Sequence, residues 1–185
     1  RFCVFGNLFA RSGLDSEVFR LDRHPTMRQH PITPMDEADL RLHLGRQTKR
    51  SIGLFDIVQL GLPDEQRREA FACLLDSAAE LVLFDTITPA DMPRIGELIW
   101  RQTASDKALF AAGSSGLEYA LAAYWRQQGW LPPVGEFKAG PVEQIVAVSG
   151  SCSPVTQRQI DRAGAGGFVD VALDTVALVD PVQAP

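Results

Sequence analysis

The chain has 185 residues and a formal net charge of −5 at pH 7. That negative balance argues against nucleic-acid binding, because no basic stripe is present to neutralise the phosphates of a duplex. No apolar run approaches the roughly 20 residues that cross a bilayer, so we expect no membrane partner. Three cysteines, an odd number without metal-ligand spacing, favour reduced thiols and a cytoplasmic location.

Apolar periodicity predicts alternating strands and helices along most of the chain. The strands are expected at residues 2–10, 18–21, 51–60, 81–85 and 108–112. The helices are expected at residues 34–44, 64–79, 88–103 and 115–128. Thr33 and Thr88 are each followed by a proline and, three positions on, by an aspartate, a pattern typical of helix starts. Three consecutive strand–helix units predict a parallel sheet with right-handed crossovers.

A second segment follows a predicted linker at residues 130–141, which contains three prolines. Beyond it the pattern restarts with a strand at 144–148, a helix at 155–163 and a strand at 168–173. We place a domain boundary near Gly140, which gives domains 1–140 and 141–185. The second segment is too short to hold a core alone, so we expect the start of a larger α/β domain. The chain begins at Arg1, and we expect it to be a piece of a longer protein.

Two turns in this pattern are suited to anions. Ser149, Gly150, Ser151 and Ser153 lie between a predicted strand and a predicted helix, where backbone N–H groups and the positive helix end favour phosphate or carboxylate. The turn at residues 113–116 repeats the arrangement with Gly113, Ser114 and Ser115. Each turn has a plain alternative, a helix cap without a ligand.

Charged residues supply two further candidates. Asp85 ends a predicted parallel strand, where ligands of open α/β sheets gather, and is a candidate for hydroxyl or Mg²⁺ binding or simply a turn residue. Arg23 and His30 belong to an arginine- and histidine-rich segment, which suits a carboxylate ligand or, alternatively, an ordinary surface loop.

Several motifs occur in an order that resembles the four-carbon acid sugar kinase family. They are Gly6-Asn7-Leu8-Phe9-Ala10, Arg20-Leu21-Asp22-Arg23-His24-Pro25, His30-Pro31-Ile32-Thr33-Pro34-Met35, Gly113-Ser114-Ser115-Gly116-Leu117, and Ser149-Gly150-Ser151-Cys152-Ser153-Pro154 followed by Thr156 and Gln159. The family's aspartate-rich Asp-Asp-x-Thr-Gly motif and its glycine-rich phosphate-binding segment are absent from these residues. The chain therefore resembles the middle of such a kinase.

The resemblance implies a parallel-sheet, acid-sugar-binding domain over residues 1–140 and the start of an ATP-binding domain over 141–185. It implies ATP and Mg²⁺ as cofactors and threonate, erythronate or 3-oxotetronate as the type of substrate, phosphorylated at the terminal hydroxyl. Ser149, Gly150, Ser151 and Ser153 would contact the nucleotide. Six residues would contact the acid: Arg23, His30, Asp85, Gly113, Ser114 and Ser115. The catalytic residues stay unassigned, and no protein metal ligand is expected.

Two alternatives remain beside the kinase. One is a non-kinase α/β module that uses the same turns to bind a phosphorylated or carboxylated metabolite. The other is a catalytically silent fragment that binds a partner. We expect the segment alone to be inactive, and its exposed sheet edges and apolar faces to favour a homo-oligomer.

Overall fold

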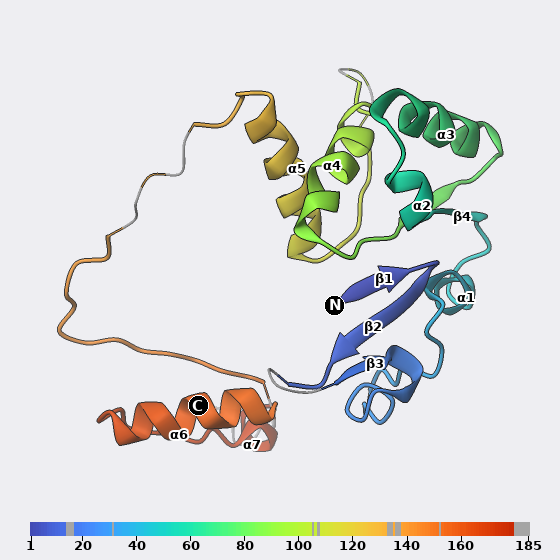
Figure 1. Cartoon of the computed structure of the whole chain (residues 1–185). Coiled ribbons are helices and arrows are strands. Elements are labelled where there is room, and N and C mark those ends of the chain that lie inside the picture. The colour runs from blue at the N-terminus through green and yellow to red at the C-terminus, as the bar shows by residue number, and fades with distance from the viewer. Residues whose placement is uncertain are drawn as a thin grey trace. The chain divides into compact units, whose positions relative to one another are not determined.

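The computed structural model describes residues 1–13, 17–30, 32–104, 106, 108–132, 135, 138–151 and 153–179 (Figure 1). They belong to two compact units, Arg1–Phe137 and Lys138–Pro185. The first unit holds a mixed α/β arrangement with a small parallel sheet. No helix among the described residues has the length and apolar character that crossing a bilayer requires.

The first unit begins with a three-stranded antiparallel sheet. Its strands are β1 (Phe2–Val4), β2 (Asn7–Arg11) and β3 (Val18–Arg20), in that order. The extended stretch expected at 2–10 is therefore present, but as two strands and not as one. The chain reverses at Phe5 and Gly6, which have φ values of 49° and 79°, the left-handed conformation that a tight hairpin turn requires.

A parallel pair lies beside this sheet. It consists of β4 (Ile52–Phe55) and β5 (Leu81–Phe84), joined through α2 (Ile57–Leu60) and α3 (Asp64–Asp76). Strand β4 stops five residues before its expected end at residue 60, because the side chain of Asp56 accepts the Gln59 N–H and caps α2. An antiparallel bridge between Cys3 and Thr86, with N···O distances of 2.8 and 3.0 Å, joins β1 to the chain just after β5.

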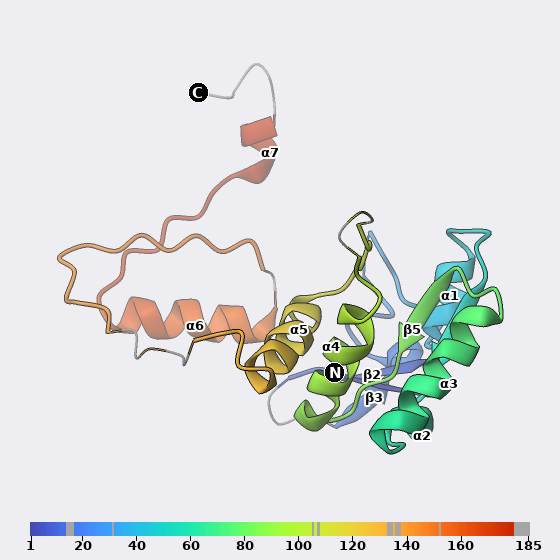
Figure 2. The same cartoon turned by 90° about the horizontal axis from the view of Figure 1, so that it is seen from above.

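Helices pack on the parallel pair and form the main core. They include η2 (Pro89–Asp91), α4 (Met92–Trp100) and α5 (Ser115–Gln127). In Figure 2, β5 runs between α3 and α4. Helices α4 and α5 touch closely at Gly96, where an added Cβ would stand 2.1 Å from the carbonyl oxygen of Ala120. The buried core combines Phe55, Leu60, Phe71, Ile95, Leu98 and Ala120.

The helix expected at 34–44 is shorter than predicted. It is α1 (Leu40–Gly45), capped by the side chain of Asp39. A short helix, η1 (Leu21–Arg23), precedes it in the chain, directly after β3. Thr33 does not start α1: the Thr33 N–H donates to the Nδ1 atom of His30 at 3.0 Å, and the helix begins at Leu40. The Met35 N–H donates to the Met27 carbonyl at 2.9 Å, which keeps this stretch out of a helical path.

Three expected strands are absent from the described residues. Residues 108–112 run without secondary structure and are exposed. The same holds for residues 144–148 and 168–173 in the second unit, whose helices are α6 (Pro154–Ala165) and α7 (Thr175–Val179). An apolar run becomes a strand only where another strand offers a ladder of hydrogen bonds, and none of these three runs pairs with a described strand.

Candidate functional site

The carboxyl ends of the parallel strands β4 and β5 form the candidate site. Each strand is followed directly by an aspartate, Asp56 after β4 and Asp85 after β5. Parallel strands end at a common edge of their sheet, and this edge is where open α/β folds gather their ligands. The β1–β2 turn reaches the same edge through the bridge between Cys3 and Thr86.

Asp85 is fully buried and connects three elements. Its Oδ1 atom accepts the Gly6 N–H at 2.9 Å, and its Oδ2 atom accepts the N–H groups of Phe5 at 2.6 Å and Ile57 at 3.1 Å. Both carboxylate oxygens are thus engaged by backbone donors from the hairpin turn and from the start of α2. Hydrogen bonds to a charged acceptor are the strong ones, so Asp85 fixes the geometry of this edge.

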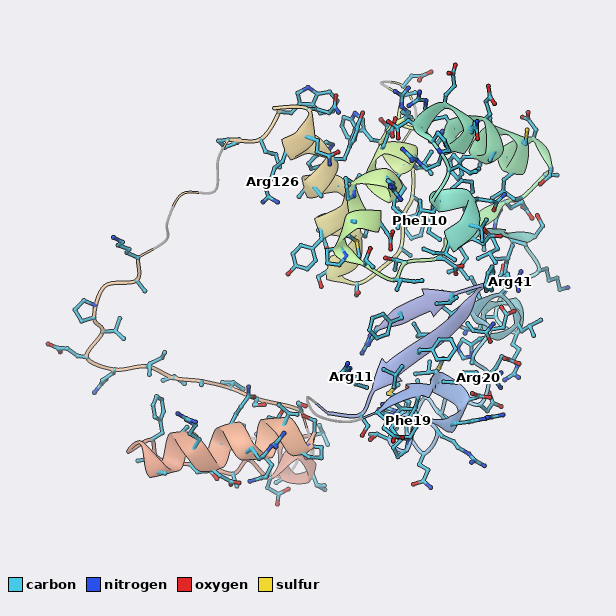
Figure 3. All side chains as sticks on the ribbon, viewed as in Figure 1. Arg11, Phe19, Arg20, Arg41, Phe110 and Arg126 are labelled. Carbon is cyan, nitrogen blue, oxygen red and sulfur yellow. The ribbon has the colours of Figure 1, made fainter. Side chains whose placement is uncertain are left out.

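An acid–arginine pair borders the same turn. Arg41 donates from Nε to Asp39 Oδ1 at 3.0 Å and from Nη2 to Asp39 Oδ2 at 2.6 Å, a bidentate pair. A Cβ on Gly6 would lie 3.0 Å from Arg41 Nε, so the turn and the guanidinium are in contact. Figure 3 shows Arg41 at the turn end of the hairpin, beside α1.

Sequence reasoning missed Asp39 and Arg41. Their only sequence signal is an aspartate and an arginine two positions apart, shortly after the segment that contains His30. The hydrogen bonds from Arg41 hold the pKa of the Asp39 carboxyl below its usual value. Nearby, burial, together with hydrogen bonding to Asp85, raises the pKa of the Cys3 thiol to about 12. The edge therefore presents an ionised carboxylate beside a thiol that stays protonated.

His24 and His30 form two similar turns. The Nδ1 atom of His24 accepts the N–H groups of Thr26 and Met27, both at 3.2 Å. The Nδ1 atom of His30 accepts those of Ile32 at 3.4 Å and Thr33 at 3.0 Å. An Nδ1 that accepts places the proton of a neutral ring on Nε2, so each ring has an Nε2–H donor.

His30 and Arg23 differ from the other members of this segment in exposure and pairing. His24 is buried, whereas His30 is half-buried and Arg23 is exposed. Within the described residues Arg23 forms no ion pair or side-chain hydrogen bond, while the neighbouring Arg20 is paired with Asp22. Neither Arg23 nor His30 bonds to Asp85 in the part of the chain that the structure describes. Asp85, which the sequence also predicts to contact the acid, is thus not joined to Arg23 or His30 by a described hydrogen bond or ion pair.

The turn at residues 113–115 is an exposed helix start. Ser114 is the N-cap residue of α5, but its side chain makes no capping hydrogen bond. Its carbonyl accepts the Leu117 N–H at 3.0 Å. Gly113 contacts the same helix, since a Cβ there would lie 3.1 Å from the Cβ of Leu117. The hydroxyls of Ser114 and Ser115 are therefore exposed at the start of a 13-residue helix.

The serine-rich turn belongs to the second unit and caps α6. Ser153 Oγ accepts the Thr156 N–H at 3.1 Å, and the Ser153 N–H donates to Ser151 Oγ at 3.3 Å. Ser149, Gly150 and Ser151 are exposed ahead of this cap; Cys152 lies outside the described residues. The helix-cap interpretation thus describes Ser153, and the contacts of this turn with a nucleotide remain a prediction.

The described residues contain no group of three or more histidine, cysteine, aspartate or glutamate side chains placed to hold a metal ion. Both carboxylate oxygens of Asp85 accept hydrogen bonds from backbone N–H groups, and the carboxylate of Asp39 is paired with Arg41. Asp56 is occupied by its helix cap, where it accepts the Gln59 N–H at 2.8 Å. The described carboxylates of this edge therefore do not fit a protein-held Mg²⁺ site.

Comparison with known proteins relates the chain to a sugar-binding domain family and to kinases of sugar acids. Residues 1–121 match the family described as the sugar-binding N-terminal domain. A 3-oxo-isoapionate kinase of Paraburkholderia graminis is 49% identical over 97% of the chain. A 3-oxo-tetronate kinase of Cupriavidus necator is 30% identical over 82% of it. The chain spans 37% and 34% of the lengths of these two kinases.

A solved structure shows the same fold. A crystal structure of a Haemophilus influenzae protein matches 89% of the chain, and 36% of its own length, with a TM-score of 0.61 and 25% sequence identity. The match extends over most of the first unit and part of the second. The described mixed α/β arrangement is therefore shared with an experimentally determined protein.

Proposed function

Since the chain belongs to the four-carbon acid sugar kinase family, through its match to the sugar-binding N-terminal domain, we propose that the full-length protein phosphorylates a small 3-oxo sugar acid with ATP. The observation that carries this proposal is its close similarity, over nearly its whole length, to a kinase whose name specifies a 3-oxo acid. The other kinase compared above also acts, by its name, on a 3-oxo acid. Among the sugar acids expected from the sequence, we therefore propose a 3-oxo acid as the substrate.

The acid is assigned to residues 1–140. A sugar acid needs cationic and N–H donors for its carboxylate. Arg23 forms no ion pair or side-chain hydrogen bond among the described residues, and His30 offers its Nε2–H, since its contacts with Thr33 are made through Nδ1. The exposed hydroxyls of Ser114 and Ser115, beside Gly113, would hydrogen-bond its hydroxyl groups. Because its oxygens are filled, Asp85 is a positioning residue that keeps the Gly6 turn, and the adjoining Arg41, in place.

The nucleotide is assigned to residues 141–185. The exposed turn of Ser149, Gly150 and Ser151, together with Ser153 at the start of α6, offers hydroxyls and backbone donors to ATP. Phosphoryl transfer depends mainly on holding the donor and the acceptor hydroxyl in line. Mg²⁺ would arrive bound to the phosphates of ATP, because the described carboxylates do not form a site for it.

The remaining parts of the proposal concern partners and location. A small sugar acid is the expected partner, and a net charge of −5 disfavours nucleic acid. With ATP as the phosphoryl donor, the cytoplasm is the compartment that we propose. A homo-oligomer also stays a prediction.

The test is ADP release by the full-length protein with 3-oxotetronate, D-threonate, L-threonate and D-erythronate as acceptors. We expect turnover with the 3-oxo acid. His30→Ala and Arg23→Ala should raise the KM for the acid about tenfold each, as expected for the loss of one charged or N–H donor. Ser151→Ala should raise the KM for ATP instead.

The matched control is Arg28→Ala, which removes an exposed arginine from the same segment. Its KM values should equal those of the unchanged protein. Absence of turnover with every acid, in a protein that folds, would contradict the kinase. An equal effect of Arg28→Ala and Arg23→Ala would contradict the assignment of Arg23 while leaving the kinase intact.

A further inference from the structure

A polar cavity of about 420 Å³ lies between α3, α4 and α5. Its size is within the range of small-molecule sites, roughly 300–1,000 Å³. Ten residues line it: Asp64, Arg67, Ala90, Pro93, Arg94, Glu97, Arg101, Tyr124, Gln127 and Gln128. None of them belongs to the candidate acid or nucleotide sites, so the cavity calls for a separate explanation.

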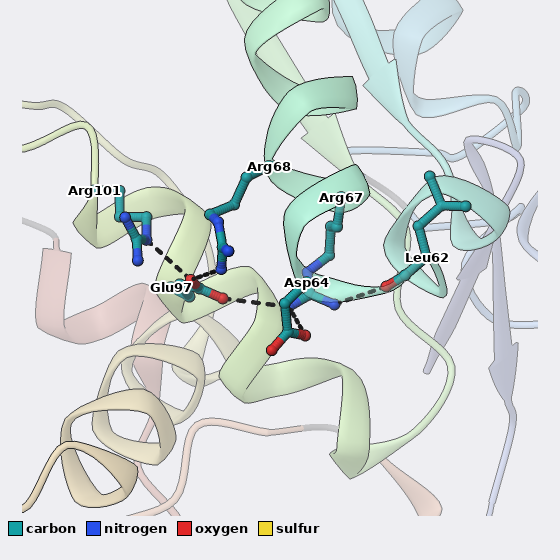
Figure 4. A network of polar contacts seen from close by, with 6 residues as sticks. All are labelled: Leu62, Asp64, Arg67, Arg68, Glu97 and Arg101. Atoms are coloured by element: carbon teal, nitrogen blue, oxygen red, sulfur yellow. Dashed lines mark hydrogen bonds and ion pairs between the residues drawn. The ribbon is translucent and has the colours of Figure 1, made fainter.

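Arg67 is the central residue of this cavity. Its side chain is only 3% exposed. It donates from Nη1 to the Leu62 carbonyl at 2.9 Å, and from Nη2 to Asp64 at 2.8 Å and to Glu97 at 3.3 Å (Figure 4). The Leu62 carbonyl on one side and the carboxylates of Asp64 and Glu97 on the other hold the guanidinium against the cavity wall. Its Nε–H is buried and has no hydrogen-bond partner among the described residues.

Glu97 is shared by several arginines. Besides Arg67, it accepts from Arg68 at 3.1 Å and from Arg101 at 2.9 Å. Burial on its own raises the pKa of the Glu97 carboxyl, but the hydrogen bonds from Arg101, Arg68 and Arg67 outweigh it and hold that pKa below its usual value. Glu97 is therefore ionised at neutral pH, and its single negative charge is divided among three cations.

The cluster as a whole carries more positive than negative charge. Arg67, Arg94 and Arg101 line the cavity against two carboxylates, Asp64 and Glu97, and Arg68 adds a fourth cation on Glu97. Two positive charges are thus left without a carboxylate in this cluster. Arg94 is half-buried and makes no ion pair or side-chain hydrogen bond within the described part of the chain. This excess positive charge attracts an anion that enters the cavity.

We propose that this cavity binds a small molecule through a phosphate group, at a site distinct from the sites for the acid and for ATP. The Arg94 guanidinium, which acts on Asp64 through space but forms no ion pair or hydrogen bond with a described side chain, makes the charged contact. The excess of two positive charges matches a phosphate dianion. Arg67 is held in place by the Leu62 carbonyl and the two carboxylates, and it supplies charge without having to move. The side chains of Tyr124, Gln127 and Gln128 add polar groups from α5.

The experiment is calorimetric titration of the full-length protein with inorganic phosphate, glycerol 3-phosphate and acetate. A saturating non-hydrolysable ATP analogue is present throughout, so that the nucleotide site is occupied. We expect saturable binding of both phosphate compounds and much weaker binding of acetate. Arg94→Gln should weaken phosphate binding about tenfold or more, the usual loss for one charge-assisted hydrogen bond.

The matched control is Arg126→Gln, which removes an arginine that projects from the outer side of α5 (Figure 3). It changes the net charge equally and should leave binding unchanged. Stronger binding of glycerol 3-phosphate than of phosphate would identify a phosphorylated metabolite as the ligand, and equal binding would identify free phosphate. The proposal is overturned by the absence of saturable phosphate binding, by acetate binding as tightly as phosphate, or by equal losses in Arg94→Gln and Arg126→Gln.

The proposal stands apart from the kinase assignment. If phosphate binds as expected while no acid is phosphorylated, the proposed function fails and the cavity assignment holds. If the kinase is active and the Arg94→Gln protein binds phosphate like the unchanged protein, the proposed function holds and the cavity assignment fails. Circular dichroism of the Arg94→Gln and Arg126→Gln proteins is the control for folding, and both spectra should match that of the unchanged protein.

Discussion

The Oδ1 atom of Asp85 accepts the N–H of Gly6 at 2.9 Å, across a separation of 79 positions in the chain. This contact joins the antiparallel hairpin to the end of the parallel pair. The Oδ2 atom adds Phe5 and Ile57, so one carboxylate holds the hairpin turn, the end of β5 and the start of α2 together. The arrangement of the candidate site depends on this residue.

Replacement of Asp85 by asparagine should therefore be strongly destabilising. The amide keeps one oxygen acceptor, loses the charge, and turns N–H donors toward the backbone donors of Phe5 or Ile57. We expect a loss of about 3 kcal/mol in the free energy of unfolding, measured by urea denaturation. Asp76→Asn, at the exposed end of α3, is the control and should change little. Equal stability of the two variants would contradict the role given to Asp85.

The contact between α4 and α5 predicts a contrast between two glycines. A Cβ at Gly96 would lie 2.1 Å from the Ala120 carbonyl oxygen, which forces the helices apart. Gly96→Ala should cost about 3 kcal/mol or more. Gly116, also in a helix, has open space around it, and Gly116→Ala should be neutral or stabilising by up to about 1 kcal/mol. Thermal unfolding of the two variants makes the comparison, and a similar loss in both would refute the close packing.

Glu97 should make stability depend on pH in the acid range. Its pKa is depressed in the folded protein, so its contribution is present above its ordinary value of 4.5 and is lost as the pH falls through the lower folded value. Glu97→Gln should therefore lose less stability than the unchanged protein between about pH 5 and pH 3. Urea unfolding at several pH values tests this. Parallel pH curves for the two proteins would contradict it.

The cysteines should differ in reactivity. Cys73 is exposed, whereas Cys3 is buried and the pKa of its thiol is raised to about 12, and the thiolate is the reactive form. In a Cys152→Ser background, iodoacetamide at pH 8 should modify Cys73 first and Cys3 only after unfolding. Mass spectrometry of peptides follows both sites. Modification of Cys3 at the rate of Cys73 in the folded protein would be the contrary result.

The 185-residue chain expressed alone should associate. An apolar hollow of about 530 Å³ over the hairpin sheet is lined mainly by hydrophobic side chains, among them Phe2, Phe9 and Ile87. Phe110 is 89% exposed, and the three expected strands without partners carry further exposed valines and leucines. Such surfaces favour oligomers or aggregates. A single monomer boundary in sedimentation at micromolar concentration would contradict this prediction.

The helices were the most predictable part of the fold. Residues 64–79, 88–103 and 115–128 were expected to be helical, and the helices α3, α4 and α5 lie within these limits. Their starts are set locally, for example by Thr88 and Asp91, which form the capping box at η2. Strands were harder, because whether an apolar run pairs depends on a distant partner. The run at 108–112 lacks such a partner among the described residues.

In the candidate site, too, features set by local sequence were predicted and contacts with distant residues were not. Asp85 was identified from its place after an apolar run, which is a local signal. Its actual contacts with Phe5, Gly6 and Ile57 could not be predicted, because they join residues that are far apart in the chain. The pair of Asp39 and Arg41 was missed because its place beside the Gly6 turn depends on a contact between residues that are far apart in the chain. The helix expected at Thr33 was wrong because this stretch folds back on the preceding loop, where the Met35 N–H donates to the Met27 carbonyl.

The contact between Asp85 and Gly6 also has a consequence for synthesis. The hairpin emerges from the ribosome before β5, and the carboxylate that receives its turn is added 79 positions later. At about 5–20 residues per second, this delay is roughly 4–16 s. During that interval the apolar face of the hairpin lacks the strand edge on which it docks, so we expect the hairpin to be exposed to chaperone binding while β5 is still being made.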